Sequence, residues 1–277
     1  MILAGNRYGK SRVRLVRVDR RPGRHDLKDL TVQIQMEGDF AAAHVDGDNR
    51  KLTATDTMKN TVYALARGGT GEIEEFGQKL GTHFLAINPA ISSTRITLRE
   101  ANWSRIVVQG KPHGSAFVRE EGGTRTATVS ATRETMQVAA GIDDLLVLKS
   151  SNTAFENFRD DIYRTLEDAR ERIVATVVRA TWLYSRTGID YGNRWTSVRR
   201  GILETFAQHD SKSVQHTLHV LGEAVLAEFA DIGEISFSLP NKHHLLVDLS
   251  PFGMTNENEI FVATDEPFGL IEATIRR

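Results

Sequence analysis

The chain has 277 residues, 40% of them hydrophobic, which is enough for one large domain or two smaller domains with real cores. Its 35 Lys and Arg against 36 Asp and Glu leave a formal net charge of −1, so nucleic acid and acidic membranes are not favoured partners. The absence of cysteine excludes disulfides, thiolate nucleophiles, iron–sulfur clusters and thiolate zinc sites.

The first half begins with strand patterns. Apolar and polar residues alternate from Leu30 to Met36, which is the period of a half-buried antiparallel strand. A similar run starts at Arg12, and Pro22-Gly23 supplies a turn, so residues 11–40 are predicted to form a long hairpin.

Helical spacing follows this hairpin. Met58, Val62 and Leu65 recur on one helical face, with Thr55 or Asp56 available as the N-cap. A second helix is predicted through residues 76–84. Strands are then predicted over residues 95–103, 104–108 and 115–118.

The second half repeats this order of elements. Strands are predicted at 124–138 and 145–148, followed by a helix over 155–172 and a strand over 173–184. Two helices, through 198–205 and 214–229, precede strands at 235–237 and 245–249. The halves share no sequence identity, and the predicted boundary near residues 139–143 divides the chain into domains 1–139 and 140–277.

These patterns predict an α+β fold with helices packed on one face of an antiparallel sheet. Such a sheet leaves open edges, and edge strands invite pairing with another chain. Closure into a barrel by oligomerisation is therefore expected.

Three polar runs lie where these elements meet. They are Thr53 to Asn60, Lys149 to Phe155 with its continuation to Arg172, and Ser238 to His243. The middle run combines an aromatic face with a planar cation, which suits a small flat anion.

These runs resemble the motifs of urate oxidases, and the resemblance covers nearly the whole chain. Further stretches match in the same order: Arg7 to Lys10, Leu80 to Phe84, Gly110 to His113 and Ser213 to Gln215. The resemblance implies two tandem T-fold units per subunit and a tunnel-shaped homotetrameric barrel. It also implies oxidation of urate by O2 and water to 5-hydroxyisourate and H2O2, in purine degradation, with no cofactor and no metal.

By this resemblance the substrate binds between two subunits. One subunit provides Phe155, Arg172, Gln215 and the backbone of Val214, and its neighbour provides Thr55 and Asp56.

The resemblance also assigns the catalytic group. It consists of Lys10, Thr55 and His243, with Asn241 beside the position of O2 or its peroxide product. Deprotonated urate is electron-rich enough to reduce O2 directly, so the main task of the protein is moving protons. Lys10 would act as the base, the Thr55 hydroxyl as the relay and His243 as the end of the path.

The residue types suit urate as a ligand. Arg172 offers a rigid fork of donors, and Gln215 donates and accepts along the same edge of the ring. Phe155 offers a stacking face. A purine that lacks one carbonyl leaves a buried donor unpaired, at about 1–3 kcal/mol.

Without the resemblance these residues have plainer interpretations. Lys10 is then a solvated turn residue, and Thr55 and Asp56 form a helix cap. Arg172 is then a surface residue of a helix, paired with Asp168 at the i,i+4 spacing.

Two alternative functions stay open on the sequence. One is a T-fold enzyme that acts on a pterin or another purine, many of which need zinc. The other is a purine-binding oligomer without catalysis. His216 and His219 have a helical i,i+3 spacing, but two ligands do not make a metal site.

The location is expected to be cytoplasmic. No run approaches the roughly 20 apolar residues that cross a bilayer, and Met1 to Gly5 lead into polar residues rather than an apolar signal core. The C-terminal residues 273–277 do not form the Ser-Lys-Leu peroxisomal address.

Overall fold

The computed structural model describes residues 1–277, and the chain forms two compact units. The first contains residues 1–141 and 183–195, and the second contains residues 142–182 and 196–277. The chain thus returns once to the first unit after entering the second.

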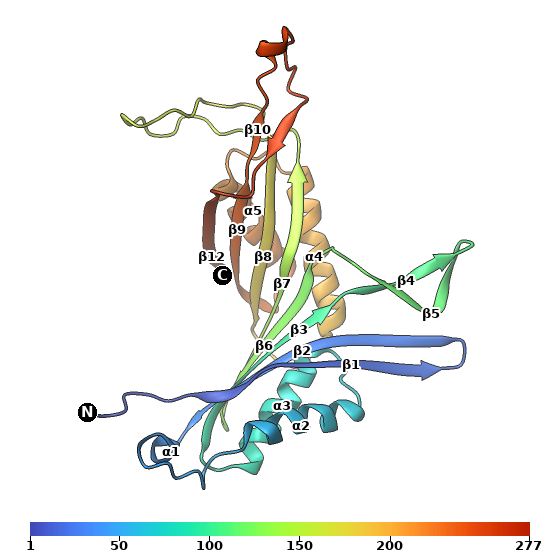
Figure 1. Cartoon of the computed structure of the whole chain (residues 1–277), viewed down its shortest axis with the longest axis vertical. Helices are drawn as coiled ribbons and strands as arrows, with labels where there is room; N and C mark the ends of the chain where they lie inside the picture. The colour runs from blue at the N-terminus through green and yellow to red at the C-terminus, as the bar shows by residue number, and fades with distance from the viewer. The chain divides into compact units, whose positions relative to one another are not determined.

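The first unit is a sheet with helices on one face (Figure 1). Its elements are β1 (Tyr8–Arg21), β2 (Arg24–Gly38), α1 (Ala41–Val45), α2 (Thr55–Arg67), α3 (Ile73–Ile87), β3 (Ile91–Ala101), β4 (Trp103–Val108), β5 (Lys111–Arg119), β6 (Thr124–Ala131) and the start of β7 (Met136–Lys149). Strands β1, β2, β3 and β6 pair antiparallel in that order, and β4 pairs with β5 in a separate hairpin. The predicted first hairpin is confirmed, with Gly23 in the left-handed conformation that its turn requires.

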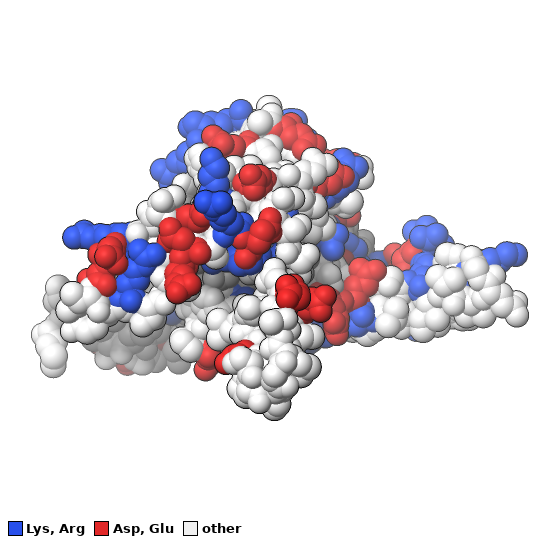
Figure 2. Space-filling view, turned by 90° about the horizontal axis from the view of Figure 1, so that it is seen from above, with Lys and Arg blue, Asp and Glu red and all other residues white.

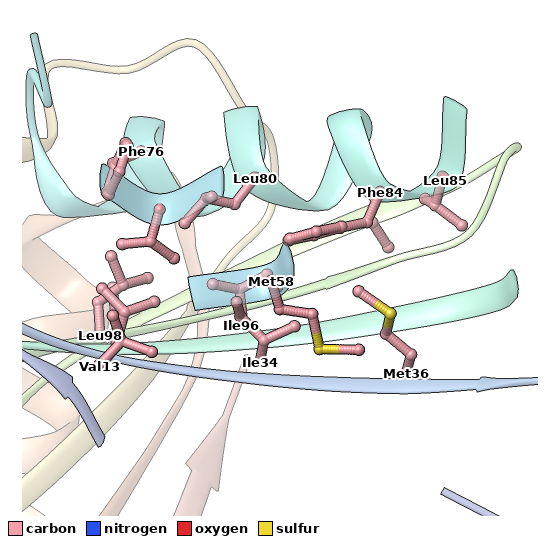
Figure 3. Packing of buried hydrophobic residues seen from close by; sticks show 14 of the residues in the cluster. Val13, Ile34, Met36, Met58, Phe76, Leu80, Phe84, Leu85, Ile96 and Leu98 are labelled. Atoms are coloured by element: carbon pink, nitrogen blue, oxygen red, sulfur yellow. The ribbon is translucent and has the colours of Figure 1, made fainter. Parts of the chain in front are cut away.

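The core of the first unit lies between this sheet and α2 and α3. The alternating residues Leu30 to Met36 turn fully buried side chains towards the helices, as the sequence predicted. Figure 3 shows Phe76, Leu80 and Phe84 of α3 reaching down to this layer. The helix can approach closely because position 77 is glycine, where a Cβ atom would lie 2.7 Å from Val129 Cγ2.

The second unit has the same layered plan. After the end of β7 its elements are β8 (Val174–Tyr184), α4 (Tyr191–Gln208), α5 (Val214–Glu228), β9 (Ile232–Lys242), β10 (His244–Leu246), a 3-10 turn (Ser250–Phe252), β11 (Phe261–Ala263) and β12 (Gly269–Arg276), with the end of β8 and the start of α4 counted in the first unit. The sheet order is β7, β8, β9, β12, and α5 packs on β9 and β12.

The prediction of a helix over residues 155–172 is wrong. This segment is an irregular arm, drawn in yellow-green in Figure 1 and tied by an antiparallel bridge between Phe155 and Ala169. Tyr163 and Leu166 are exposed, and so is Ile162, so no buried face supports a helix. Asp168 pairs with Arg164 at 2.9 Å, so the plainer interpretation of Arg172 as an ion-paired helix residue does not hold.

Two smaller predictions also differ from the structure. Ala54 occupies the N-cap of α2 without a side-chain bond, so Thr55 and Asp56 are its first helical residues rather than its cap. The strand predicted over 124–138 is two strands, because the Thr132 hydroxyl accepts the backbone N–H of Thr135 at 3.0 Å and closes a turn. Elements α1, β11 and β12 were not predicted.

The distribution of surface charge and the apolar length of the helices agree with the composition. Positive and negative side chains are interspersed on the face shown in Figure 2, as the net charge of −1 leads one to expect. None of the helices is both long and apolar enough to cross a membrane.

Candidate functional site

Lys10 lies at an irregularity of the first hairpin. The register between β1 and β2 shifts between Lys10 and Val13, and Arg12 has a positive φ of 57°. Such bulges redirect a side chain away from the regular alternation of a strand. The Lys10 side chain is half-buried.

Thr55 and Asp56 lie in the first turn of α2, and both are exposed. The Asp56 carboxylate binds the Lys59 ammonium and accepts a bond from Asn60 Nδ2 at 3.0 Å. The bond from Lys59, the charge of Lys59 and, more weakly, the charge of Lys10 lower the pKa of Asp56. Lys10 and Asp56 are therefore close enough to interact.

One contact explains how the first unit brings these residues together. The Tyr8 hydroxyl in β1 accepts the backbone N–H of Thr53 at 2.8 Å, which ties the strand of Lys10 to the entry of α2. Tyr8 packs edge-on against Phe40 with ring centroids 4.8 Å apart. Tyr8 stands in the run Arg7 to Lys10, but no pattern in the sequence signals this role.

In the second unit, Arg172 lies beside Phe155. The guanidinium carbon is 5.0 Å from the centre of the Phe155 ring, a cation–π distance. Arg172 has no carboxylate partner, its Nε is buried without a hydrogen bond, and burial lowers the pKa of Arg172. A partly desolvated cation without a counter-charge is suited to an anionic ligand.

The arm that carries Phe155 is tied to the start of α5. The Ala154 N–H donates to the Ser211 carbonyl at 2.7 Å, and the Ser211 hydroxyl lies 2.7 Å from the Thr217 hydroxyl. The Thr153 carbonyl accepts the Arg172 N–H at 3.1 Å. Thr153 and Ser211 are buried positioning residues, which sequence reasoning missed because short polar residues are typical of any loop.

Val214 and Gln215 are the first residues of α5. Ser213 caps the helix by accepting the backbone N–H of His216 at 3.0 Å. The N–H groups of Val214 and Gln215 have no helical acceptor at this end, and Gln215 is exposed with no side-chain partner. The helix start therefore presents donors and a partial positive charge.

Asn241 and His243 lie at the end of β9. Asn241 is 9% exposed, and its Nδ2 is 3.5 Å from His243 Nδ1. This arrangement leaves His243 Nε2 without a protein partner. His243 stands between the last residue of β9 and the first residue of β10, so this contact rather than strand alternation places the two side chains together.

The structure thus gathers the predicted residues into two groups. Lys10, Thr55 and Asp56 belong to the first unit, and the other six belong to the second: Phe155, Arg172, Val214, Gln215, Asn241 and His243.

Three hollows of the chain lie away from these groups. One of about 470 Å³ is lined by α3 and the turn before β7, and others of about 360 and 350 Å³ lie on the sheets. None of them is lined by a predicted site residue. The chain also holds no group of three or more His, Asp or Glu side chains that could bind a metal ion.

The chain is similar to proteins of one family along its length. The uricase family model matches residues 6–130 and 138–272. The uricase of Arthrobacter globiformis is 45% identical, over 100% of this chain and 90% of that protein. The uricase of Dictyostelium discoideum is 38% identical, over 99% of this chain and 97% of that protein.

Solved structures agree with the sequence matches. The crystal structure of the Arthrobacter globiformis uricase has a TM-score of 0.96 and covers 100% of this chain and 95% of that chain. A uricase from Bacillus fastidious shares the fold at a TM-score of 0.83 with 23% identity, over 98% of this chain and 93% of that chain. The α+β T-fold prediction is confirmed by these matches, and the chain belongs to the uricase family, whose members are the oxidoreductases named urate oxidases.

Proposed function

We propose that this uricase oxidises urate with O2 and water to 5-hydroxyisourate and H2O2 without a resident cofactor, at a site shared between two subunits. The observation that carries the proposal is the Arg172 guanidinium, which is partly buried, lacks any carboxylate partner and lies 5.0 Å from the Phe155 ring. A flat anion offers the counter-charge that Arg172 lacks and a π-face suited to an aromatic ring.

Residues at the start of α5 offer further hydrogen-bonding groups for urate. Gln215 and the free N–H of Val214 stand at the start of α5, where the helix dipole favours negative charge. Together with the Arg172 fork they can bind the carbonyl and ring N–H groups along one edge of urate. Phe155 would hold the plane of the ring.

Proton transfer is assigned to the polar groups near the start of α2 and the end of β9. Lys10 is half-buried and close enough to Asp56 to interact with it, and Thr55 is exposed in the first turn of α2. We assign Lys10 as the base, Thr55 as the relay and His243 as the end of the path, with Asn241 beside O2. Urate, once deprotonated, then transfers an electron to O2, and the protein moves protons.

Two open strand edges support a homotetramer. Strand β1 ends the sheet of the first unit, and β12 ends that of the second. The β4–β5 hairpin and the β10–β11 region also expose apolar side chains, including Val107, Val108, Leu245 and Leu246. Pairing of edges and burial of these side chains between subunits would complete the T-fold barrel and bring the two groups of site residues together. The cytoplasmic location stays a prediction.

The assay follows urate, O2 and H2O2 together in chelator-treated protein. We expect loss of the ultraviolet band of urate with matching O2 uptake and H2O2 formation. Activity that appears only after added zinc or flavin would contradict the cofactor-free reaction. Tight binding of urate without O2 uptake would instead support a purine-binding oligomer, and turnover of a pterin or another purine in place of urate would support the other T-fold enzymes.

A further inference from the structure

Four side chains of the arm between Phe155 and Arg172 stack in sequence. The Phe155 and Phe158 rings are nearly parallel, at an interplanar angle of 12°, with centroids 4.7 Å apart. The Arg164 guanidinium carbon is 4.2 Å from the centre of the Phe158 ring. With Arg172 beside Phe155, cations flank a pair of aromatic rings.

Arg164 is fixed by three contacts of its own. Its Nη2 binds the Asp168 carboxylate at 2.9 Å, its Nε donates to the Leu166 carbonyl at 3.0 Å, and Asp160 lies 3.7 Å from Nη1. Asp168 also accepts the backbone N–H of Asn157 at 3.2 Å. The stack is therefore closed by bonds across the arm and does not depend on aromatic contact alone.

The arm has no apolar core that would replace this stack. Ile162 and Tyr163 are 88% and 85% exposed, and the arm lacks regular secondary structure. Ordering the backbone of such an arm costs conformational entropy. The stacked ring pair and the cation over the ring offset part of this cost. Side chains that fix Phe155 before the ligand arrives reduce the ordering that binding requires.

We infer that Phe158 and Arg164 are positioning residues of the purine site: they hold the Phe155 ring in the plane on which the substrate stacks. Phe158 stacks on one face of Phe155 at a centroid distance of 4.7 Å and thereby fixes the orientation of the ring. This inference rests on the proposed function, since it takes Phe155 as the stacking residue for urate.

The test compares Phe158→Leu with Phe158→Tyr, because leucine keeps apolar volume while tyrosine keeps the ring. Binding of xanthine, a flat purine that lacks the third carbonyl of urate, is measured by calorimetry beside urate kinetics. We expect Phe158→Leu to weaken xanthine binding and raise the urate KM about 3- to 10-fold, with kcat within about twofold of the unaltered enzyme. Phe158→Tyr should restore both values.

Arg164→Gln tests the other end of the stack and does not alter a ring. We expect a smaller loss of xanthine affinity, about two- to fivefold. Arg170→Gln is the matched control, because it also removes an ion-paired guanidinium of the arm, bound to Glu156 at 3.1 Å, but touches no ring. Ile162→Ala is the apolar control. Both controls should bind xanthine as the unaltered enzyme does.

Equal xanthine affinity in Phe158→Leu and the controls would overturn the inference, and so would equal losses in Phe158→Tyr and Phe158→Leu. Failure of the proposed function has a different result: the unaltered protein would bind xanthine but consume no urate. The xanthine titrations would then still decide the role of the stack. A protein that binds neither purine would refute both.

Discussion

Among the predicted site residues, Arg172 differs from ordinary surface cations in what it does not contact. It has no carboxylate partner within the chain, whereas Arg164 and Lys59 do. A partly buried cation without a counter-charge destabilises the folded chain unless a ligand supplies one. The residue types and their order were predictable from the sequence, but the unpaired state of Arg172 was not, because an aspartate at the i,i+4 spacing is equally compatible with an ion pair.

Lys10→Ala should lower kcat about 10²- to 10⁴-fold, the usual range for a general acid or base. Binding of xanthine should change little, since Lys10 is assigned to proton transfer rather than to the substrate clamp. Steady-state O2 uptake and calorimetry measure the two effects. Lys51→Ala, which removes an exposed ammonium paired with Asp39, is the control. A Lys10→Ala enzyme with unchanged kcat would remove Lys10 from the mechanism.

Arg172→Ala should weaken binding of urate and xanthine alike. Hydrogen bonds to charged groups are worth about 1.5–3 kcal/mol, which corresponds to a loss of roughly 10- to 150-fold. Calorimetric titration with xanthine gives the number without interference from turnover. If the affinity for xanthine is unaltered, the clamp is not Arg172.

His209 should make stability depend on pH. Its Nε2 is buried without a partner, and burial lowers the pKa of His209, with contributions from the nearby His216 and Lys149. The charge of the nearby Asp210 acts in the opposite direction and raises the pKa of His209. Because the folded pKa lies below the ordinary value of about 6.5, the unfolded chain takes up the proton first as pH falls. This part of the stability is present above about pH 6.5 and is lost as pH falls through the folded pKa.

The measurement is Tm between pH 7.5 and 5. His209→Gln should reduce the fall of Tm over this range, while His219→Gln, at an exposed histidine 3.3 Å from Glu223, should leave the fall unchanged. Parallel curves of Tm against pH for the unaltered enzyme and His209→Gln would show that His209 does not contribute to the pH dependence of stability.

At the scale of elements, the sequence predicts those helices and strands that bury one face in the core. Period-two alternation placed the long hairpin, and helical spacing placed α2, α3 and α5, because each of these elements buries one face. The same reasoning failed for residues 155–172, where the apolar periodicity has no surface within the chain to pack on. Strand β12 was missed because its side chains are mostly exposed, with Leu270 at 56%.

Close packing of helix on sheet gives an element-scale prediction. In Gly77→Ala the new methyl group would lie 2.7 Å from Val129 Cγ2 and 2.9 Å from Leu98 Cδ1, so α3 must shift. We expect a loss of about 1–3 kcal/mol in the free energy of unfolding. In Gly201→Ala on α4 the nearest atom is Glu228 Oε2 at 3.4 Å, at the end of a flexible side chain. That change should stabilise by about 0.4–1 kcal/mol.

Denaturant unfolding of the two variants provides the comparison. The two changes in the free energy of unfolding should have opposite signs, although both substitutions add one methyl group to a helical glycine. This difference in sign is a sharper test than the size of either change. Equal effects of the two substitutions would contradict the packing described for α3.

At the scale of the whole molecule, the predicted site residues divide between the two units. The groups of Lys10 and of Arg172 lie in different units. The sequence resemblance implies that neighbouring subunits join these groups. The open edges of β1 and β12 and the exposed apolar side chains are the surfaces that would form this assembly in our proposal.

Complementation between two inactive variants tests this account most directly. Thr55→Ala damages the first unit and Arg172→Ala the second, so a subunit of each kind retains one intact half. Co-expression of the two, with mixed oligomers verified by native mass spectrometry, is compared with each variant alone in an O2 uptake assay with urate. Random mixing leaves about one quarter of shared sites with both halves intact. The account predicts recovery of about a quarter of the unaltered activity, and mixed oligomers as inactive as their parents would contradict it.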